Sequence, residues 1–87
     1  MDLTKKIKIR NDIEITVIEG KKALLDFNAG SCYIIKGVGN DILDMLHEEI
    51  TINGIVDKLL TEYDVSREEC ERSVTDFLKE LEKADFI

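Results

Sequence analysis

Residues 13–35, IEITVIEGKKALLDFNAGSCYII, decide the fold of this chain. The first six alternate in polarity and are rich in β-branched side chains, as a half-buried strand requires. Gly20 and Gly30 each belong to a short turn segment, and apolar segments suited to strands follow over 23–27 and 31–35. The stretch therefore predicts a meander of three short antiparallel strands.

Downstream of this stretch the spacing of apolar side chains becomes helical. The pattern predicts helices over 38–47 and 52–63, and a third helix that follows Ser66. Thr51 and Ser66 suit the N-caps of the second and third helices, and Glu69 completes a capping-box pattern with Ser66. We expect the helices to bury, in order, Val38, Ile42, Met45 and Leu46; Ile52, Ile55, Val56, Leu59, Leu60 and Tyr63; and Cys70, Val74, Phe77, Leu78 and Leu81.

The order of the elements, strands first and helices second, defines the expected architecture. We predict an α+β, winged helix-turn-helix-like fold, in which a three-stranded antiparallel sheet is followed by three helices. The apolar tail over 84–87 should fold back onto the body. With 87 residues and a mass of 9.9 kDa, the chain is expected to form one domain over residues 1–87 with a small core.

Composition and charge exclude several classes of function. The chain is 44% hydrophobic and 36% charged, as in a soluble globular protein, and no apolar run approaches the ~18–20 residues of a membrane span. No secretion signal is visible, so we expect a cytoplasmic location. The net charge is −7, made up of +2 over residues 1–40 and −9 over residues 41–87. The acidic part should be repelled by nucleic-acid phosphates and by anionic membranes.

The side chains that usually carry catalysis are scarce. His47 is the one histidine, and Cys32 and Cys70 are the two cysteines, with no spacing that suits a metal. The carboxylates at 48–49, 68–69 and 80/82 lie among other charges and suit solvated surfaces. Both thiols are expected to be reduced and half-buried, and a bridge between them stays open as an alternative. We therefore expect a binding module without catalytic residues, metal or cofactor.

Several segments carry a resemblance to a known family. They are LLD at 24–26, GSCYIIKGVG at 30–39, ILDML at 42–46, IVDKLLTEYDV at 55–65, VTDFLKEL at 74–81 and ADFI at 84–87. Together they resemble the PqqD-like proteins, the recognition elements of pathways that modify ribosomally made peptides. The likeness is strongest to the stand-alone leader-binding subunits of lasso-peptide maturation. Two positions depart from the family, which usually has Asn at Lys36 and often Trp at Leu43.

The resemblance implies that this chain binds the leader segment of a precursor peptide. In the family, the leader adds a strand to the edge formed by the third strand, beside the third helix, and the complex serves a leader protease, a radical SAM enzyme or another modifying enzyme. A PqqD-type role in pyrroloquinoline quinone synthesis or another radical-enzyme pathway is the alternative. The expected peptide-binding residues are Ser31, Cys32, Tyr33, Ile34, Ile35 and Lys36, and Arg67, Arg72, Ser73, Asp76, Phe77 and Lys79.

Strand chemistry supports the same hypothesis. An edge strand has unpaired N–H and C=O groups to which an extended peptide can bond, and it can also pair two copies of the chain as a homodimer. On 31–35, Cys32 and Ile34 should share one face, and Tyr33 and Ile35 the other. We expect one or two of the cations on the third helix, or Lys36, to meet an acidic side chain of the leader.

Two rival functions remain at this point. Strands followed by a capped helix pair also suit a DNA-binding winged helix. However, residues 66–83 have 4 basic and 6 acidic side chains, a net of −2, which is unfavourable beside phosphates. The other rival is a small enzyme or an adaptor with no peptide ligand.

Overall fold

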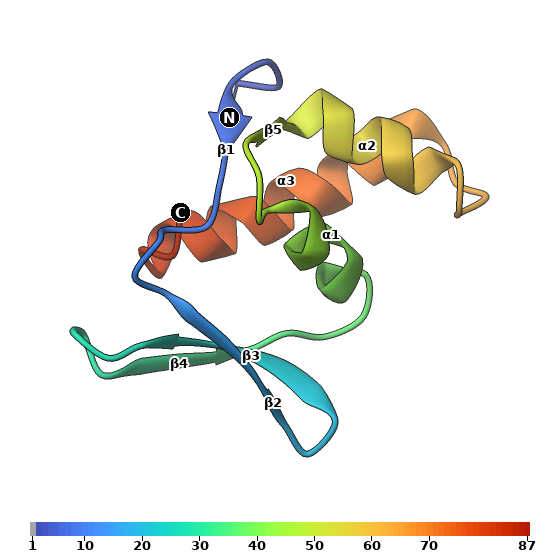
Figure 1. Cartoon of the computed structure of the whole chain (residues 1–87). Helices are drawn as coiled ribbons and strands as arrows, with labels where there is room; N and C mark the ends of the chain where they lie inside the picture. Colours follow the sequence, from blue (N-terminus) through green and yellow to red (C-terminus); the bar gives the residue numbers. More distant parts are fainter. Residues whose placement is uncertain (1) are drawn as a thin grey trace.

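The computed structural model describes residues 2–87 and places a three-stranded antiparallel sheet beneath a helical body (Figure 1). The strands β2 (Glu14–Ile18), β3 (Lys21–Asp26) and β4 (Ser31–Ile34) pair in chain order. Glu19 and Gly20 form the two-residue turn between β2 and β3, and both have positive φ, at 51° and 78°. This backbone matches the twist of the flanking strands. The predicted meander is confirmed.

The three predicted helices are also present, although the first two are shorter than expected. They are α1 (Gly39–Met45), α2 (Ile52–Leu60) and α3 (Arg67–Lys83), so the predicted α+β, winged-helix-like order is confirmed. Thr51 Oγ accepts a hydrogen bond from Gly54 N (3.0 Å), and Ser66 Oγ accepts one from Glu69 N (3.1 Å). Both predicted N-caps therefore satisfy amides at the start of a helix.

A short second sheet was not anticipated. The strand β1 (Lys6–Ile7) pairs antiparallel with β5 (Ile50–Thr51), which immediately precedes α2. Asn53 N also donates to Leu3 O (3.2 Å). The N-terminal segment thus lies against the start of α2, as Figure 1 shows, and it buries Ile7 in the core.

Some expected core positions lie at the surface instead. Tyr63 is 43% exposed because α2 ends at Leu60, so that position no longer follows the helical stripe. Val38 is 37% exposed because it precedes α1. Phe27, the last residue of the predicted second strand, lies beyond the end of β3 and is 72% exposed, because the carboxylate of Asp26 accepts hydrogen bonds from the amides of the next turn. Phe77, Met45 and Leu60 are partly buried at the edge of the core.

The core lies between the inner face of the sheet and the three helices. It also takes up the N-terminal segment and the C-terminal tail, in which Phe86 is only 1% exposed, so the predicted return of the tail is confirmed. The members of this core are Ile7, Ile9, Ile13, Leu24, Ile35, Ile42, Leu43, Leu46, Ile52, Ile55, Val56, Leu59, Cys70, Val74, Leu78, Leu81 and Phe86. No helix within residues 2–87 has the length and hydropathy needed to cross a membrane.

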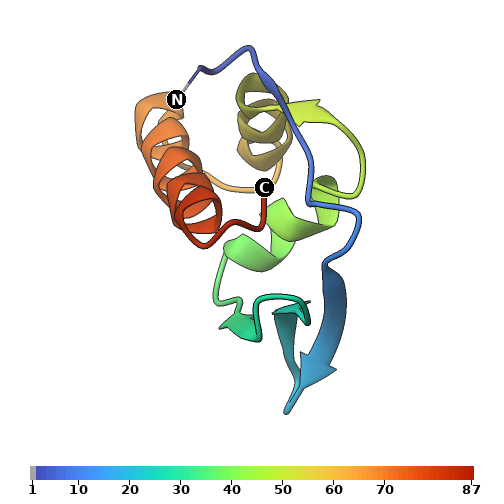
Figure 2. The ribbon, with the colours of Figure 1, turned by 90° about the vertical axis from the view of Figure 1, so that its left-hand side faces the viewer.

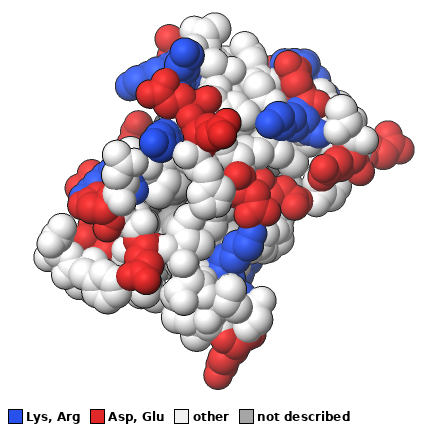
Figure 3. Space-filling view, in the orientation of Figure 1, with Lys and Arg blue, Asp and Glu red and all other residues white. Residues whose placement is uncertain are grey.

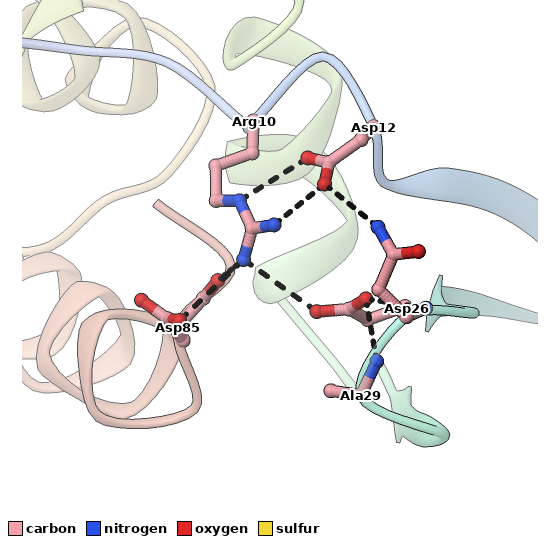
Figure 4. Close-up of polar contacts among 6 residues, drawn as sticks. Arg10, Asp12, Asp26, Ala29 and Asp85 are labelled. Atoms are coloured by element: carbon pink, nitrogen blue, oxygen red, sulfur yellow. Dashed lines mark hydrogen bonds and ion pairs between the residues drawn. The ribbon is translucent and has the colours of Figure 1, made fainter.

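Arg10 joins the sheet to the C-terminal tail (Figure 4). Its guanidinium donates to Asp12 (2.6 Å) and to the backbone oxygen of Asp85 (2.6 Å), and lies 3.5 Å from the buried carboxylate of Asp26. Its backbone N–H donates to Phe86 O (3.0 Å). The hydrogen bond from Arg10 lowers the pKa of Asp12 below its ordinary value. This cluster fixes where the sheet lies relative to the helices.

Candidate functional site

The free edge of β4 is the first component of the candidate site. In the sheet order β2-β3-β4, no strand within residues 2–87 pairs with the outer side of β4. Ile35 N donates to Lys22 O (2.8 Å), so the backbone N–H of Ile35 points toward β3. Because these groups alternate in an antiparallel ladder, the backbone N–H and C=O of Cys32 and Ile34 point outward.

The helix α3 supplies a wall beside this edge. Figure 2 shows β4 and α3 on the same side of the molecule, with the start of α1 between them. A Cβ added to Gly39 would lie 2.8 Å from Phe77 Cε1 and 3.1 Å from Ile35 Cγ2. The aromatic ring of α3 can therefore approach the end of β4 only because position 39 has no side chain. We call the outer edge of β4 at Cys32 and Ile34, together with Gly39 and Phe77, the β4–α3 face.

The side chains of β4 alternate as the sequence predicted. Tyr33 points inward and packs edge-to-face on Phe86, with ring centroids 6.1 Å apart, and Ile35 is buried. Cys32 and Ile34 lie on the opposite face and are exposed. A peptide strand added at this edge would direct alternate side chains inward, toward Phe77, and outward, beside Ile34.

An apolar hollow of about 180 Å³ lies near the N-terminal half of α3. Its lining comes from the loop before α1, the end of α2, the connection to α3, and α3 itself. The lining residues are Val38, Leu59, Tyr63, Val65, Glu69, Cys70, Ser73 and Val74. Ser73 of the hollow is one helical turn from Phe77 of the β4–α3 face, so the two surfaces adjoin on α3.

Sequence reasoning missed most of this hollow. The sequence pattern places Tyr63 in the second predicted helix and Val65 between that helix and the third, and it predicts no site role for either residue. The available signal was the pair of large apolar residues in the short segment between the two helices, where a turn is usually polar. In the structure these residues are 43% and 44% exposed.

Two of the predicted cationic site residues already have acidic partners. Arg67 donates to Asp57 of α2 (2.8 Å) and to Glu71 (3.2 Å), and is directed toward α2. Arg72 is 4.0 Å from Glu68 on the exposed side of α3. The positive charges of both arginines are thus balanced by carboxylates on α2 or one helical turn away on α3.

Lys79 lies on another flank of α3. It is two residues from Phe77, which corresponds to about 200° around a helix. It lines a separate hollow of about 460 Å³ between β1 and α3. That hollow also includes Lys5, Lys6 and Lys8. Figure 3 shows the face of the Figure 1 view, on which basic and acidic side chains are interspersed. Lys79 therefore lies on the side of α3 that faces the N-terminal segment.

The remaining predicted residues lie at or near the β4–α3 face. Ser31 begins β4 and is exposed, and Lys36 follows it, with its carbonyl accepting from Gly39 N (3.1 Å). Asp76 is exposed on α3 next to Phe77 in the sequence. The structure places Phe77 beside Gly39 and Ile35 at the end of β4, one helical turn from Ser73, and it pairs Arg67 and Arg72 with carboxylates of α2 and α3.

The two cysteines lie in different environments. Cys32 and Cys70 are both free, the first exposed and the second buried, and burial raises the pKa of the Cys70 thiol. The expectation of two half-buried thiols is therefore wrong in detail. Within residues 2–87, no three His, Cys, Asp or Glu side chains group closely enough to hold a metal ion.

Two comparisons with known proteins gave matches. The family model described as "Coenzyme PQQ synthesis protein D (PqqD)" matches residues 21–87. A solved structure described as "TbiB1 in Complex with the TbiA(beta) Leader Peptide" is similar, with a TM-score of 0.82 and 30% sequence identity over 92% of this chain and 93% of that chain. No protein with a curated description matches the sequence.

Proposed function

Because the chain belongs to the PqqD family, we propose that it binds the leader segment of a ribosomally made precursor peptide and delivers it to a modifying enzyme or a leader protease. The observation that carries the proposal is the unpaired edge of β4 beside α3. The similarity to TbiB1, whose structure was solved with a leader peptide, supports it. We assign this role to residues 1–87 as one domain, in lasso-peptide or related peptide maturation.

The proposed mechanism is strand addition. The leader pairs with β4 through the outward N–H and C=O groups of Cys32 and Ile34. Each net hydrogen bond contributes about 1 kcal/mol, so the backbone gives register and some affinity with little demand on sequence. Specificity then comes from side chains that pack on Phe77 and in the apolar hollow beside Ser73.

The expected affinity for the leader reflects the entropy that the leader loses and the order that β4 already has. A flexible leader loses backbone entropy when it is ordered on β4, which lowers the affinity for a given area. The edge itself is already formed, so only one partner has to be ordered. We expect a dissociation constant in the sub-micromolar to micromolar range, roughly −8 to −10 kcal/mol.

A titration tests the proposal directly. The leader encoded beside this chain's gene, labelled with fluorescein, is titrated with the protein, and its fluorescence anisotropy is measured. We expect saturable binding in the range above, and none with a scrambled leader of the same composition. Absence of binding at tens of micromolar would overturn the proposal. A gel shift with duplex DNA, repeated at increasing salt, tests the winged-helix rival, which the net charge of −2 over residues 66–83 disfavours.

The identity of the partner enzyme is a separate question. The description of the matching family favours a role in coenzyme PQQ synthesis, where the resemblance implies a radical SAM enzyme. The leader complex of TbiB1 favours a peptide pathway of another kind. Co-purification of the chain with the enzyme encoded beside it, with and without the leader, distinguishes a leader protease from a radical enzyme.

A further inference from the structure

We propose that the leader recognised by this chain is cationic where it meets the hollow between α2 and α3: it inserts one apolar side chain there and has a Lys or Arg next to that side chain. This inference rests on the proposed function and specifies its substrate class. It also reverses the sign expected from the sequence, which paired cations of α3 with an acidic leader. Four features of the structure support it.

The first feature is the apolar character of the hollow. Val38, Tyr63 and Val65 line it while remaining 37%, 43% and 44% exposed, and Leu59 and Val74 form part of its buried lining. Three large apolar side chains exposed around one concavity are typical of a surface that a partner covers. The volume of about 180 Å³ suits one aliphatic or aromatic side chain rather than a helix.

The second feature is one carboxylate in the lining of this hollow and another that is hydrogen-bonded to a lining residue. Glu69 belongs to its lining, and Asp41 accepts a hydrogen bond from the hydroxyl of Tyr63 (2.5 Å), another lining residue. Within residues 2–87, neither carboxylate lies within 4.0 Å of a basic side chain, since the ion pairs involve other residues. Their negative charge is therefore available to a ligand.

The third feature is the absence of a competing positive charge from the lining. No lysine or arginine is among the residues that line the hollow. The two arginines in the first half of α3 are directed to other carboxylates, Arg67 to Asp57 and Arg72 toward Glu68. An acidic leader residue would meet like charge here, whereas a basic one would find a partner.

The fourth feature is continuity with the β4 edge. Ser73 of the hollow and Phe77 of the β4–α3 face are one helical turn apart on α3. Val38, another lining residue, directly precedes Gly39, over which the Phe77 ring lies. A peptide paired with β4 therefore reaches the hollow just beyond Ile34, and the cationic residue belongs to that end of the bound segment.

Charge-swapped peptides and one matched pair of variants test the inference. The leader encoded beside the gene is synthesised as found, with its Lys and Arg replaced by Glu, and with its Asp and Glu replaced by Lys. Each peptide is titrated by fluorescence anisotropy at 50 and 300 mM NaCl. We expect the Glu-substituted copy to bind at least about fivefold more weakly, and salt to weaken the natural leader.

The protein variants locate the effect. Glu69→Lys should weaken the natural leader by about five- to tenfold and remove most of its salt dependence. Glu68→Lys makes the same charge change at an exposed neighbour outside the hollow and should stay within about twofold. If Glu69→Lys leaves affinity unchanged or improves it while the leader still binds, the inference is wrong and the proposed function stands. If the natural leader does not bind the unaltered protein, the proposed function itself fails.

Discussion

The two edges of the three-stranded sheet differ in what lies beside them. Both β2 and β4 are unpaired on their outer sides within residues 2–87. Beside β4 lies α3, with Phe77 over Gly39, whereas Figure 2 shows no helix beyond β2. The β2 edge exposes Val17 (65%) and Ile18 (42%). The hollow at the start of β2, lined by Ile13 and Ile15 together with Arg10 and His47, is more polar than the hollow beside α3.

This difference shows that an unpaired edge is necessary for strand addition but not sufficient for recognition. The backbone of either edge offers the same donors and acceptors. Only the β4 edge adds an aromatic wall and an adjoining apolar hollow, which are able to select particular side chains. The charged residues Lys21 and Lys22, on the neighbouring strand β3, do not supply such a wall.

The largest expected effect comes from blocking one edge at a time. Ile34→Pro removes an outward N–H from β4, and its ring obstructs an incoming strand. We expect leader affinity to fall by about 30-fold or more in an anisotropy titration, equivalent to about 2 kcal/mol. In both this variant and its control, circular dichroism should confirm a folded chain.

Val17→Pro is the matched control at the other edge. By the register of β2 with β3, its N–H also points outward, and its side chain is exposed. We expect leader affinity to stay within about twofold of the unaltered protein. Equal losses in the two variants would show that the difference between the edges does not govern binding.

The wall is tested by a double-mutant cycle on Gly39 and Phe77. Phe77→Ala removes the aromatic surface and should weaken leader binding by about tenfold. Gly39→Ala adds a Cβ that would lie 2.8 Å from Phe77 Cε1. The added group displaces the aromatic ring, so leader affinity should fall by about three- to fivefold. In the Phe77→Ala background the same glycine substitution should have almost no further effect on affinity.

Phe27→Ala is the control for losing an aromatic ring. Phe27 follows β3 and is 72% exposed. Leader affinity should remain within about twofold of the unaltered protein. If Gly39→Ala still weakens leader binding in the Phe77→Ala background, the role assigned to the contact between position 39 and the Phe77 ring is wrong.

The sequence allowed the elements and their order to be predicted, because these depend on local patterns. Alternation over 13–18, the turn glycines, and the caps at Thr51 and Ser66 act within a few residues of one another. The pairing of β1 with β5 joins residues more than forty positions apart. No local pattern specifies such a pair, since each strand has only two residues.

The candidate site was predictable in part for the same reason. The alternation that puts Cys32 and Ile34 on one face of β4 and Tyr33 and Ile35 on the other follows from strand periodicity. The partners of Arg67 do not, because Asp57 comes from another helix and meets it only in the folded chain. Periodicity alone also could not show that α2 ends at Leu60 and leaves Tyr63 beside a hollow.

The smallest expected effect concerns how the β2 side of the sheet is held. The hydrogen bond from Arg10 lowers the pKa of Asp12 in the folded state below the ordinary value of 3.8. A carboxyl group whose pKa is lower in the folded than in the unfolded state stabilises the fold above its unfolded pKa, and this contribution is lost as the pH falls through the folded value. Between pH 5 and pH 3, the Tm of the unaltered protein should therefore fall further than that of Asp12→Asn, by about 2 °C or less for this exposed pair. Leader affinity at pH 7 should be the same in both proteins, because the Arg10 cluster positions the sheet without touching the β4 edge. A marked loss of affinity in Asp12→Asn would mean instead that the cluster controls the spacing between β4 and α3.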